Sequence, residues 1–256
     1  MLKRIEIIPI YIKGQITPNS NIVNTLLRTI KKNNNNQSIE NGDIIVLAQK
    51  IISKIEGRLI NLDDINPSKK SIDLSKQIDK DPRIIELILQ ESNKIVRIFN
   101  NIVIAETHHG FICANAGIDQ SNVSNKKDQV LLLPINPDKS AESIRKEIYE
   151  KTRKKIAVVI TDTFGRPFRM GQTNVAIGIA GINPLKSYKG KQDMFGKILR
   201  VTEIAIVDEI AGAAELVMGK TEGIPIAIVR NVKYSKRSNS ITKIIRKEKN
   251  DIFRWI

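Results

Sequence analysis

The sequence is poor in residues that could cross-link the chain or bind zinc. Its 256 residues include one cysteine, Cys113, and two histidines, His108 and His109. An internal disulfide is therefore excluded, and a reducing cytoplasm is the expected environment. The set of about four cysteine or histidine ligands that a structural zinc site needs is also missing.

Aromatic residues and long apolar runs are scarce as well. No segment approaches the roughly 18 uncharged apolar residues of a membrane helix, so we expect no membrane contact. Glu6 and Pro9 interrupt the apolar N-terminal stretch and no cleavage site follows, which favours a strand over a signal peptide. Aromatics form 4% of the chain and apolar residues 41%, so isoleucine, valine and leucine must fill a substantial core.

Acidic residues are few relative to basic ones. The chain has 42 lysines and arginines against 27 aspartates and glutamates, a net charge of +15. Such a balance is typical of proteins that bind nucleic acid, membrane surfaces or anionic small molecules. It also fits a biased base composition, because lysine, asparagine and isoleucine are all over-used. Without many aromatics or an RNA-binding signature, a nucleic-acid binder is the weaker alternative.

Apolar periodicity predicts strands mixed irregularly with helices. This irregular order disfavours a doubly wound sheet and favours an α+β fold, with mixed sheets and two intertwined subdomains in a single unit, 1–256. The expected helices lie within 20–32, 81–92 and 233–256, the last of them basic and on the surface. Two further segments are each expected to begin as a strand and continue as a helix: 131–155, with a Pro-bounded loop between the two, and 203–219. The expected strands lie within 1–14, 42–52, 156–160 and 223–232, with a hairpin at 95–107.

The common nucleotide-binding loops are missing. No G-x-G-x-x-G occurs, and the segment AIGIAG contains only Gly178 and Gly181, whose expected role is close packing. Gly219, Lys220 and Thr221 resemble the end of a Walker A loop. The glycine that this motif needs five residues earlier is Ala214, in an apolar helix. A P-loop is therefore not expected.

Polar residues cluster where strands are predicted to stop. The run 156–160 is expected to end at Thr161-Asp162-Thr163, and a second acidic segment holds Asp119 and Asn122. Carboxylates and a hydroxyl on separate loops suit Mg²⁺ or Mn²⁺. For either segment alone, an Asx turn or a helix cap is the alternative.

Basic side chains accompany these segments. Arg166 and Arg169 offer planar forks to a carboxylate or phosphate, with surface ion pairs as the alternative. Lys50 and Lys54 could hold a phosphate chain, with a solvated basic edge as the alternative.

Four segments together resemble the coenzyme F-420:L-glutamate ligases, also called F-420-0:gamma-glutamyl ligases. Their order and spacing match as well, so the resemblance covers most of the chain. The segments are GDIIVLAQKIISKIEGR (42–58), HGFICANAGIDQSNV (109–123), VVITDTFGRPFRMGQTNVAIGIAG (158–181) and DEIAGAAELVMGKTEGIPIAIVRN (208–231).

The resemblance implies a GTP-dependent ligase with an α+β fold and a nucleotide site unlike a P-loop. Such an enzyme adds L-glutamate to the lactyl carboxylate of coenzyme F-420-0 through an acyl phosphate. It then adds a second glutamate to F-420-1 through a gamma linkage. Two divalent metals (Mg²⁺ or Mn²⁺), a potassium ion and a homodimer are further implications, whereas nucleic acid is not an expected partner. An amide ligase with another carboxylate acceptor is the alternative.

The resemblance also assigns site residues. Asp119 and Asp162 would bind metal and Thr163 a second metal, and Asp119, Asp162, Arg166 and Arg169 are the expected catalytic residues. Nucleotide contacts are expected at Lys13, Gly14, Gln15, Ile16, Gln49, Lys50, Lys54, Asn122, Met218, Gly219, Lys220, Thr221, Glu222, Gly223 and Ile224.

Three positions depart from the family pattern. The segment 13–16 lacks the Gly-x-Pro that relatives often have, and Asn174 stands where relatives often carry aspartate, so Asn174 is assigned no role. Lys220 stands where some relatives place an acidic or amide ligand of the second metal. A protonated lysine cannot ligate, so Glu222 or water is the alternative ligand.

Overall fold

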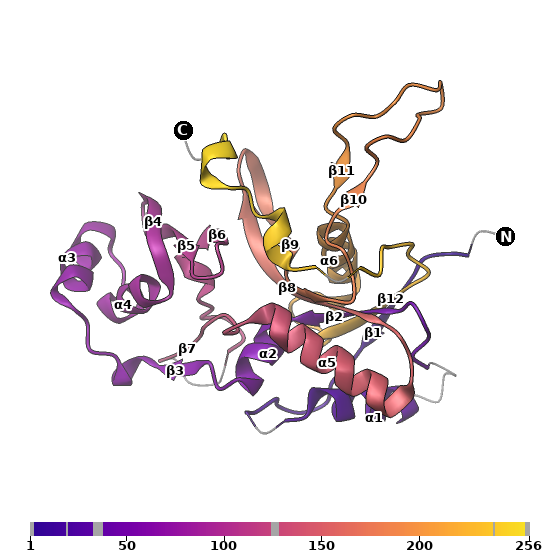
Figure 1. The fold of residues 1–256 in the computed structure, drawn as a ribbon. Helices are drawn as coiled ribbons and strands as arrows, with labels where there is room; N and C mark the ends of the chain where they lie inside the picture. The colour runs from indigo at the N-terminus through magenta and orange to yellow at the C-terminus, as the bar shows by residue number, and fades with distance from the viewer. Residues whose placement is uncertain (1–2, 19, 33–37, 124–127, 238, 254–256) are drawn as a thin grey trace.

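The structure is a computed structural model that describes residues 3–18, 20–32, 38–123, 128–237 and 239–253. Within these ranges, helices and strands are mixed along the chain (Figure 1). The strands form one sheet of five, one of three and two of two. The fold is α+β, as the sequence predicts.

The five-stranded sheet carries most of the buried core. Neighbouring strands are antiparallel except for β2 and β8, which are parallel. Residues 44–47 and 157–160 are completely buried because helices cover both faces of the sheet, and these strands therefore have continuous apolar sequences. In spatial order the strands are β1 (Glu6–Ile10), β12 (Ile226–Arg230), β2 (Ile44–Ala48), β8 (Ala157–Arg166) and β9 (Arg169–Ala180).

Three of the helices cover this sheet. α1 (Ile22–Lys32) contacts α5 (Pro137–Thr152), which packs on β8 and β9. α6 (Ile206–Met218) packs on β1, β9 and β12, and Figure 1 shows it on the opposite face. Each helix buries an apolar stripe and exposes its polar face. No helix in the described part of the chain is both long enough and apolar enough to cross a membrane.

Residues 58–123 and 128–133 form a second part of the molecule. The chain leaves the main sheet after α2 (Gln49–Ile55) and returns to it in α5. A separate cluster of buried side chains, including Ile85, Ile88 and Val103, stabilises this part. That the two parts behave as subdomains remains a prediction. The elements of the second part are β3 (Leu59–Asn61), η1 (Leu62–Asp64), α3 (Lys69–Ile78), α4 (Pro82–Gln90), β4 (Ser92–Phe99), β5 (Ile102–Thr107), β6 (Ile112–Ala114), η2 (Asn115–Gly117) and β7 (Gln129–Leu131).

Local signals in the sequence are confirmed at several element ends. Asp81 caps α4 by accepting a hydrogen bond from the amide of Arg83, and Pro82 is its first residue. Asn100, with φ of 52°, turns the hairpin between β4 and β5. Gly219 ends α6, as predicted.

The strand predicted to end at Thr161-Asp162-Thr163 continues instead. β8 runs on to Arg166, and the chain turns at Pro167 and Phe168 into β9. The hairpin beyond residue 160 lines a pocket and meets solvent, so its sequence is polar. It therefore lacks the apolar alternation by which a half-buried strand is recognised.

The predicted basic helix at 233–256 is not formed by the described residues of that range. They contain two short 3-10 helices, η3 (Ile241–Ile244) and η4 (Glu248–Asn250). Ile241 packs into the main core, whereas most neighbouring side chains are partly or fully exposed. Ile241 and the partly buried Tyr234, Ile244 and Ile245 pack on the core, but they do not form the continuous apolar stripe that stabilises an amphipathic helix.

A long arm projects from the sheet between β9 and α6 (Figure 1). Its base is a two-stranded ladder of β10 (Lys186–Ser187) and β11 (Glu203–Ile204). The loop between these strands leaves Met194, Phe195 and Val201 almost fully exposed.

Close packing between β9 and α5 predicts the effect of adding one methyl group. A Cβ at Gly178 would collide with the side chain and backbone of Pro137, the first residue of α5. We expect Gly178→Ala to lower the free energy of unfolding by about 1–3 kcal/mol, measured by urea denaturation. Gly212→Ala is the matched control, because Gly212 lies within α6 and a Cβ there would meet Thr173 and Asn174 only at ordinary contact distances of 3.8 and 3.9 Å. It should stabilise the protein by roughly 0.5–1 kcal/mol. Equal effects of the two changes would contradict this packing.

Candidate functional site

A cavity of about 860 Å³ opens where the main sheet meets the second part. The pairing of the parallel strands β2 and β8 ends at Ala48 opposite Thr161. The first residues of α2 and the continuation of β8 beyond Thr161 therefore share one edge of the sheet. The other walls come from the second part and from the loop after α6. The cavity brings together most of the predicted site residues: Gly14, Gln15, Ile16, Gln49, Lys50, Lys54, Asp119, Asn122, Asp162, Thr163, Met218, Gly219, Lys220, Thr221, Gly223 and Ile224.

Asp119 and Asp162 form an acidic pair in this cavity. Burial, reinforced by the negative charge of Asp119, raises the pKa of the Asp162 carboxyl to about 7. Burial also raises the pKa of Asp119, although nearby Lys50 opposes this. The Oδ2 atom of Asp119 is buried and accepts no hydrogen bond from the described residues. Lys50, 3.5 Å from Asp119 Oδ2, only partly offsets the charge of the two carboxylates, and a bound cation would supply further positive charge.

Lys50 and Lys54 lie one turn apart on α2 and both line the cavity. Lys50 Nζ donates a hydrogen bond to the carbonyl of Ser121 at 2.8 Å and lies 3.5 Å from Asp119 Oδ2. Lys54 makes no ion pair with any described residue. Burial, and then the charge of Lys50, lowers the pKa of Lys54. An anion in the cavity would relieve this repulsion.

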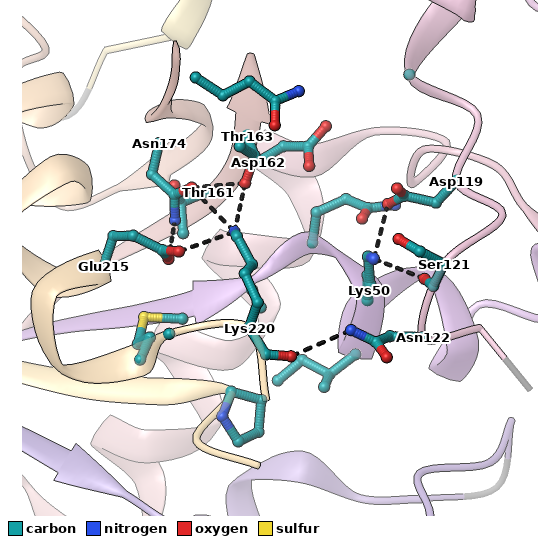
Figure 2. A pocket seen from close by; sticks show the side chains of 18 of the residues that line it. Lys50, Asp119, Ser121, Asn122, Thr161, Asp162, Thr163, Asn174, Glu215 and Lys220 are labelled. Carbon is teal, nitrogen blue, oxygen red and sulfur yellow. Dashed lines mark hydrogen bonds and ion pairs between the residues drawn. The ribbon is translucent and has the colours of Figure 1, made fainter. Parts of the chain in front are cut away.

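A second polar cluster, the Lys220 cluster, consists of Lys220, Thr163, Asn174 and Glu215 (Figure 2). The Lys220 ammonium donates to Thr163 Oγ1 at 2.6 Å and lies 2.9 Å from Glu215 Oε1 and 3.5 Å from Asn174 Oδ1. The Thr163 hydroxyl donates to Asn174 Oδ1 at 2.7 Å. Asn174 Nδ2 in turn donates to Glu215 Oε2 at 2.7 Å. These four side chains form a closed hydrogen-bonded network.

The loop after α6 has a fixed shape. Gly219 has φ of 56° and ψ of −167°, a region open only to glycine. A Cβ there would collide with the Glu222 carboxylate, which accepts hydrogen bonds from the amide and hydroxyl of Thr221. Asn122 Nδ2 donates to the carbonyl of Lys220 at 3.1 Å and joins this loop to the second part.

Gln49 provides an unused acceptor in the cavity. Its side chain is buried, and Nε2 donates to Ser53 Oγ at 2.9 Å and to the Leu132 carbonyl at 3.3 Å. Its Oε1 atom receives no hydrogen bond from the described residues. A ligand donor reaching this atom would satisfy it.

Four predicted site residues do not line the cavity. Arg166 and Arg169 lie opposite each other at the exposed tip of the β8–β9 hairpin, because β8 continues past Thr163. Arg166 donates to the Met170 carbonyl there, at 3.2 Å. Lys13 is exposed outside the cavity, and Glu222 is held by its own loop. Glu222 therefore does not replace Lys220 as a ligand in this structure.

The cavity also contains residues that the sequence analysis missed. Asn174 was assigned no role, yet it is opposite Thr163 in the β8–β9 register. Recognising the hairpin would have placed the two side chains together. Glu215 lies in the last turn of α6, and no pattern in the sequence indicates that it belongs to the site. Cys113 also lines the cavity, where burial and Asp162 raise the pKa of its thiol to about 12 and keep it neutral.

The Asp119–Asp162 pair and the Lys220 cluster differ in how well they suit a metal ion. No group of three or more histidine, cysteine, aspartate or glutamate side chains in the described ranges has a metal-binding arrangement. The pair of Asp119 and Asp162 nevertheless fits a divalent cation, since both are oxygen ligands and Asp119 Oδ2 is unpartnered. Thr163 fits one less well, because the Lys220 ammonium already contacts its hydroxyl.

The raised pKa of Asp162 predicts how stability depends on pH in metal-free protein. The folded state keeps this proton up to about pH 7. The unfolded state releases it near pH 4, because the ordinary pKa of an aspartate is about 3.9. The free energy of unfolding should therefore fall as pH rises from about 4 to about 7. Asp162→Asn removes this contribution, so at pH 8 we expect the variant to exceed the unchanged protein by roughly 1–3 kcal/mol. Urea denaturation in EDTA at several pH values measures the difference, and parallel pH profiles would contradict it.

Comparison with known proteins identifies the family. A family model described as F420-0:Gamma-glutamyl ligase matches residues 12–231. The coenzyme F420:L-glutamate ligase of Methanocaldococcus jannaschii is 47% identical over 217 residues, 84% of this chain and 86% of the relative. The protein of the same name from Methanopyrus kandleri is 37% identical over 258 residues, 99% of each chain. The chain therefore belongs to the F420-0:gamma-glutamyl ligase family.

Proposed function

We propose that this protein is a GTP-dependent ligase that adds L-glutamate to the lactyl carboxylate of coenzyme F420-0. The observation that carries the proposal is the single cavity that holds the Asp119–Asp162 pair together with Lys50, Lys54 and Lys220. Acidic groups for a metal and basic groups for phosphates are the parts that phosphoryl transfer needs. The names of the relatives supply the acceptor and the amino acid.

The reaction requires activation of a carboxylate, because a carboxylate does not react with an amine near neutral pH. In the proposed first step, a lactyl carboxylate oxygen attacks the γ-phosphorus of GTP and the bond to the β-phosphate oxygen breaks, which releases GDP. In the second step, the glutamate amine attacks the acyl phosphate. An amide bond forms, inorganic phosphate leaves, and the amine gives up a proton.

The side chains of the cavity have distinct proposed roles in these steps. Lys50 and Lys54 neutralise and orient the phosphate chain. Asp119 and Asp162 hold a divalent ion, Mg²⁺ or Mn²⁺, which supplies positive charge to the phosphate oxygens when it is bound. Gln49 and Asn122 present amide groups to the nucleotide.

Backbone segments complete the proposed nucleotide site. Gly14, Gln15 and Ile16 line the cavity from the segment after β1, and the loop 218–224 lines it after α6, apart from Glu222. A backbone that approaches a nucleotide closely needs small residues, and Gly14, Gly219 and Gly223 all have positive φ.

Three further features of the proposal rest on the family resemblance. A second glutamate is added to F420-1 by a gamma linkage, potassium assists the reaction, and the active form is a homodimer. The exposed apolar residues of the β10–β11 arm supply a surface for a second copy. The excess basic charge serves anionic substrates, and nucleic acid is not required.

The direct test is to assay the reaction with each component omitted in turn. The protein is incubated with GTP, Mn²⁺, L-glutamate and unglutamylated coenzyme, and mass spectrometry is used to count the added glutamyl units. One or two added units that depend on every component support the proposal. GDP release without a glutamylated product would indicate another carboxylate acceptor. Salt-sensitive binding of a random oligonucleotide, without GTP binding, would indicate a nucleic-acid binder.

Asp119 and Asp162 should act as one unit in catalysis. We expect Asp119→Asn and Asp162→Asn each to lower turnover by about 100-fold or more, because an amide is a poorer ligand for a hard dication than a carboxylate. The double variant should lose little beyond either single variant. Turnover and melting temperature are measured on the same preparations, with Asp73→Asn on exposed α3 as the control. A single variant that keeps full turnover would remove that residue from the site.

Lys54 should contribute to nucleotide affinity. Lys54→Gln removes a cation that has no ion-pair partner among the described residues, so the fold should be retained. We expect GTP to bind roughly tenfold more weakly, equivalent to about 1.4 kcal/mol, when measured by calorimetry in the presence of Mn²⁺. Lys70→Gln removes the same charge from α3 and should change nothing. Unchanged GTP affinity in Lys54→Gln would show that Lys54 is only a solvated edge residue.

A further inference from the structure

We propose that the ammonium group of Lys220 occupies a cation position formed by Thr163, Asn174 and Glu215. In this chain, a dissociable divalent ion therefore binds only at Asp119 and Asp162, where the family resemblance implies two such ions. The first part of the inference, the ammonium in the cation position, concerns only the side chains of the Lys220 cluster. The second part, one divalent-ion site in place of two, rests on the proposed function.

The geometry of the cluster is that of a small cation site. Three oxygen atoms, from a hydroxyl, an amide and a carboxylate, surround one nitrogen at distances of 2.6, 3.5 and 2.9 Å. An ammonium group has three donors and no acceptor, so its hydrogen-bonding capacity matches this set. Asn174 is almost completely buried, and its amide nitrogen holds Glu215 in place. The oxygens are therefore arranged before any ligand binds.

The charges of the cluster favour the ammonium over a dication. Glu215 is its one carboxylate, and Thr163 and Asn174 are neutral, so Lys220 brings the cluster to neutrality. A divalent ion at the same oxygens would lie within a few ångströms of the ammonium. At 4 Å, even two unit charges repel by about 4 kcal/mol near a protein surface. The dication would bind only if Lys220 moved away.

The backbone keeps Lys220 next to this cluster. The glycine-only conformation of Gly219 sets the direction of the chain as it leaves α6. Asn122 holds the carbonyl of Lys220 from the second part. The Lys220 side chain remains 56% exposed, so its ammonium also faces the open cavity. Its charge adds to that of Lys50 in lowering the pKa values of Asp119 and Asp162 against the effect of burial.

The Lys220 ammonium thus stays permanently at this position, where it offsets the charge of Glu215. A metal ion at this position would depend on its concentration in solution and would leave with the product. The Lys220 ammonium does not depend on the metal concentration and cannot leave with the product. The cavity therefore retains a cation near β9 and α6 through the whole reaction cycle. Lys50 lies beside Asp119 on the other side (Figure 2). A divalent ion held by Asp119 and Asp162 would add positive charge there.

The test is to count the Mn²⁺ ions bound to the full chain. Equilibrium dialysis followed by elemental analysis measures the number of ions per chain, first without nucleotide and then with a non-hydrolysable GTP analogue. We expect Lys220→Gln and Lys220→Ala each to bind one Mn²⁺ more than the unchanged chain under at least one condition. Lys220→Arg keeps a cation at the cluster and should bind no extra ion. Lys189→Gln is the matched control, since Lys189 pairs with Glu203 on the distant arm.

Adding Glu215→Gln to Lys220→Gln should abolish the extra ion, which would locate it in the cluster. Two Mn²⁺ ions on the unchanged chain, or no gain in either neutral variant, would overturn the inference. If the unchanged chain binds none and Lys220→Gln binds one, the first part of the inference stands. The second part, which assigns a divalent ion to Asp119 and Asp162, is then overturned. If the counts are as expected but no glutamylated product forms, the failure lies in the proposed function alone.

Discussion

The parallel pairing of β2 with β8 is the constraint on which the site depends. It is the one parallel contact between neighbouring strands in the main sheet as described. Because of it, both strands run toward the same edge, where β2 passes into α2 and β8 extends beyond its last pair with β2. Gln49 and Lys50 meet Asp162 and Thr163 there. If the same two strands were antiparallel, these residues would lie at opposite edges. The buried apolar strands thus fix the positions of polar residues that do not themselves stabilise the core.

Positive and negative charges are balanced around the cavity without being fully paired. Lys50 is shared between Asp119 and a backbone carbonyl, Lys54 has no acidic partner in the described ranges, and Asp162 retains a raised pKa. A structure optimised only for stability would pair or remove such groups. Their persistence in one cavity is typical of a site where ligand charges complete the pairing.

Much of the fold could be predicted from the sequence, because local signals determine it. The cap at Asp81, the turn at Asn100 and the apolar runs of β2, β8 and β12 each act within a few residues. The continuation of β8 into a hairpin depends instead on pairing between Thr163 and Asn174, eleven positions apart. The 3-10 helices near the C-terminus depend on where Ile241 meets the core. Neither can be recognised from periodicity.

The candidate site was predicted only in part for the same reason. The acidic pair and the lysines of α2 were recognised through the family resemblance, and the structure brings them into one cavity. Arg166 and Arg169 were misplaced because the strand was expected to stop early. Glu215 has no recognisable role in the sequence because its importance comes from contacts with Asn174, which is distant in sequence, and with Lys220, which lies beyond the end of its helix.

The cavity lies between two parts of the molecule that have separate hydrophobic cores, and this couples ligand affinity to folding. Lys50 reaches Ser121 and Asp119 in the second part, and Asn122 reaches back to Lys220. A ligand bound between these walls stabilises only molecules in which the second part is folded against the sheet. Any substitution that loosens the distant core around Ile85 and Val103 would therefore weaken binding without touching the ligand. A saturating ligand would conceal the same defect in a melting experiment.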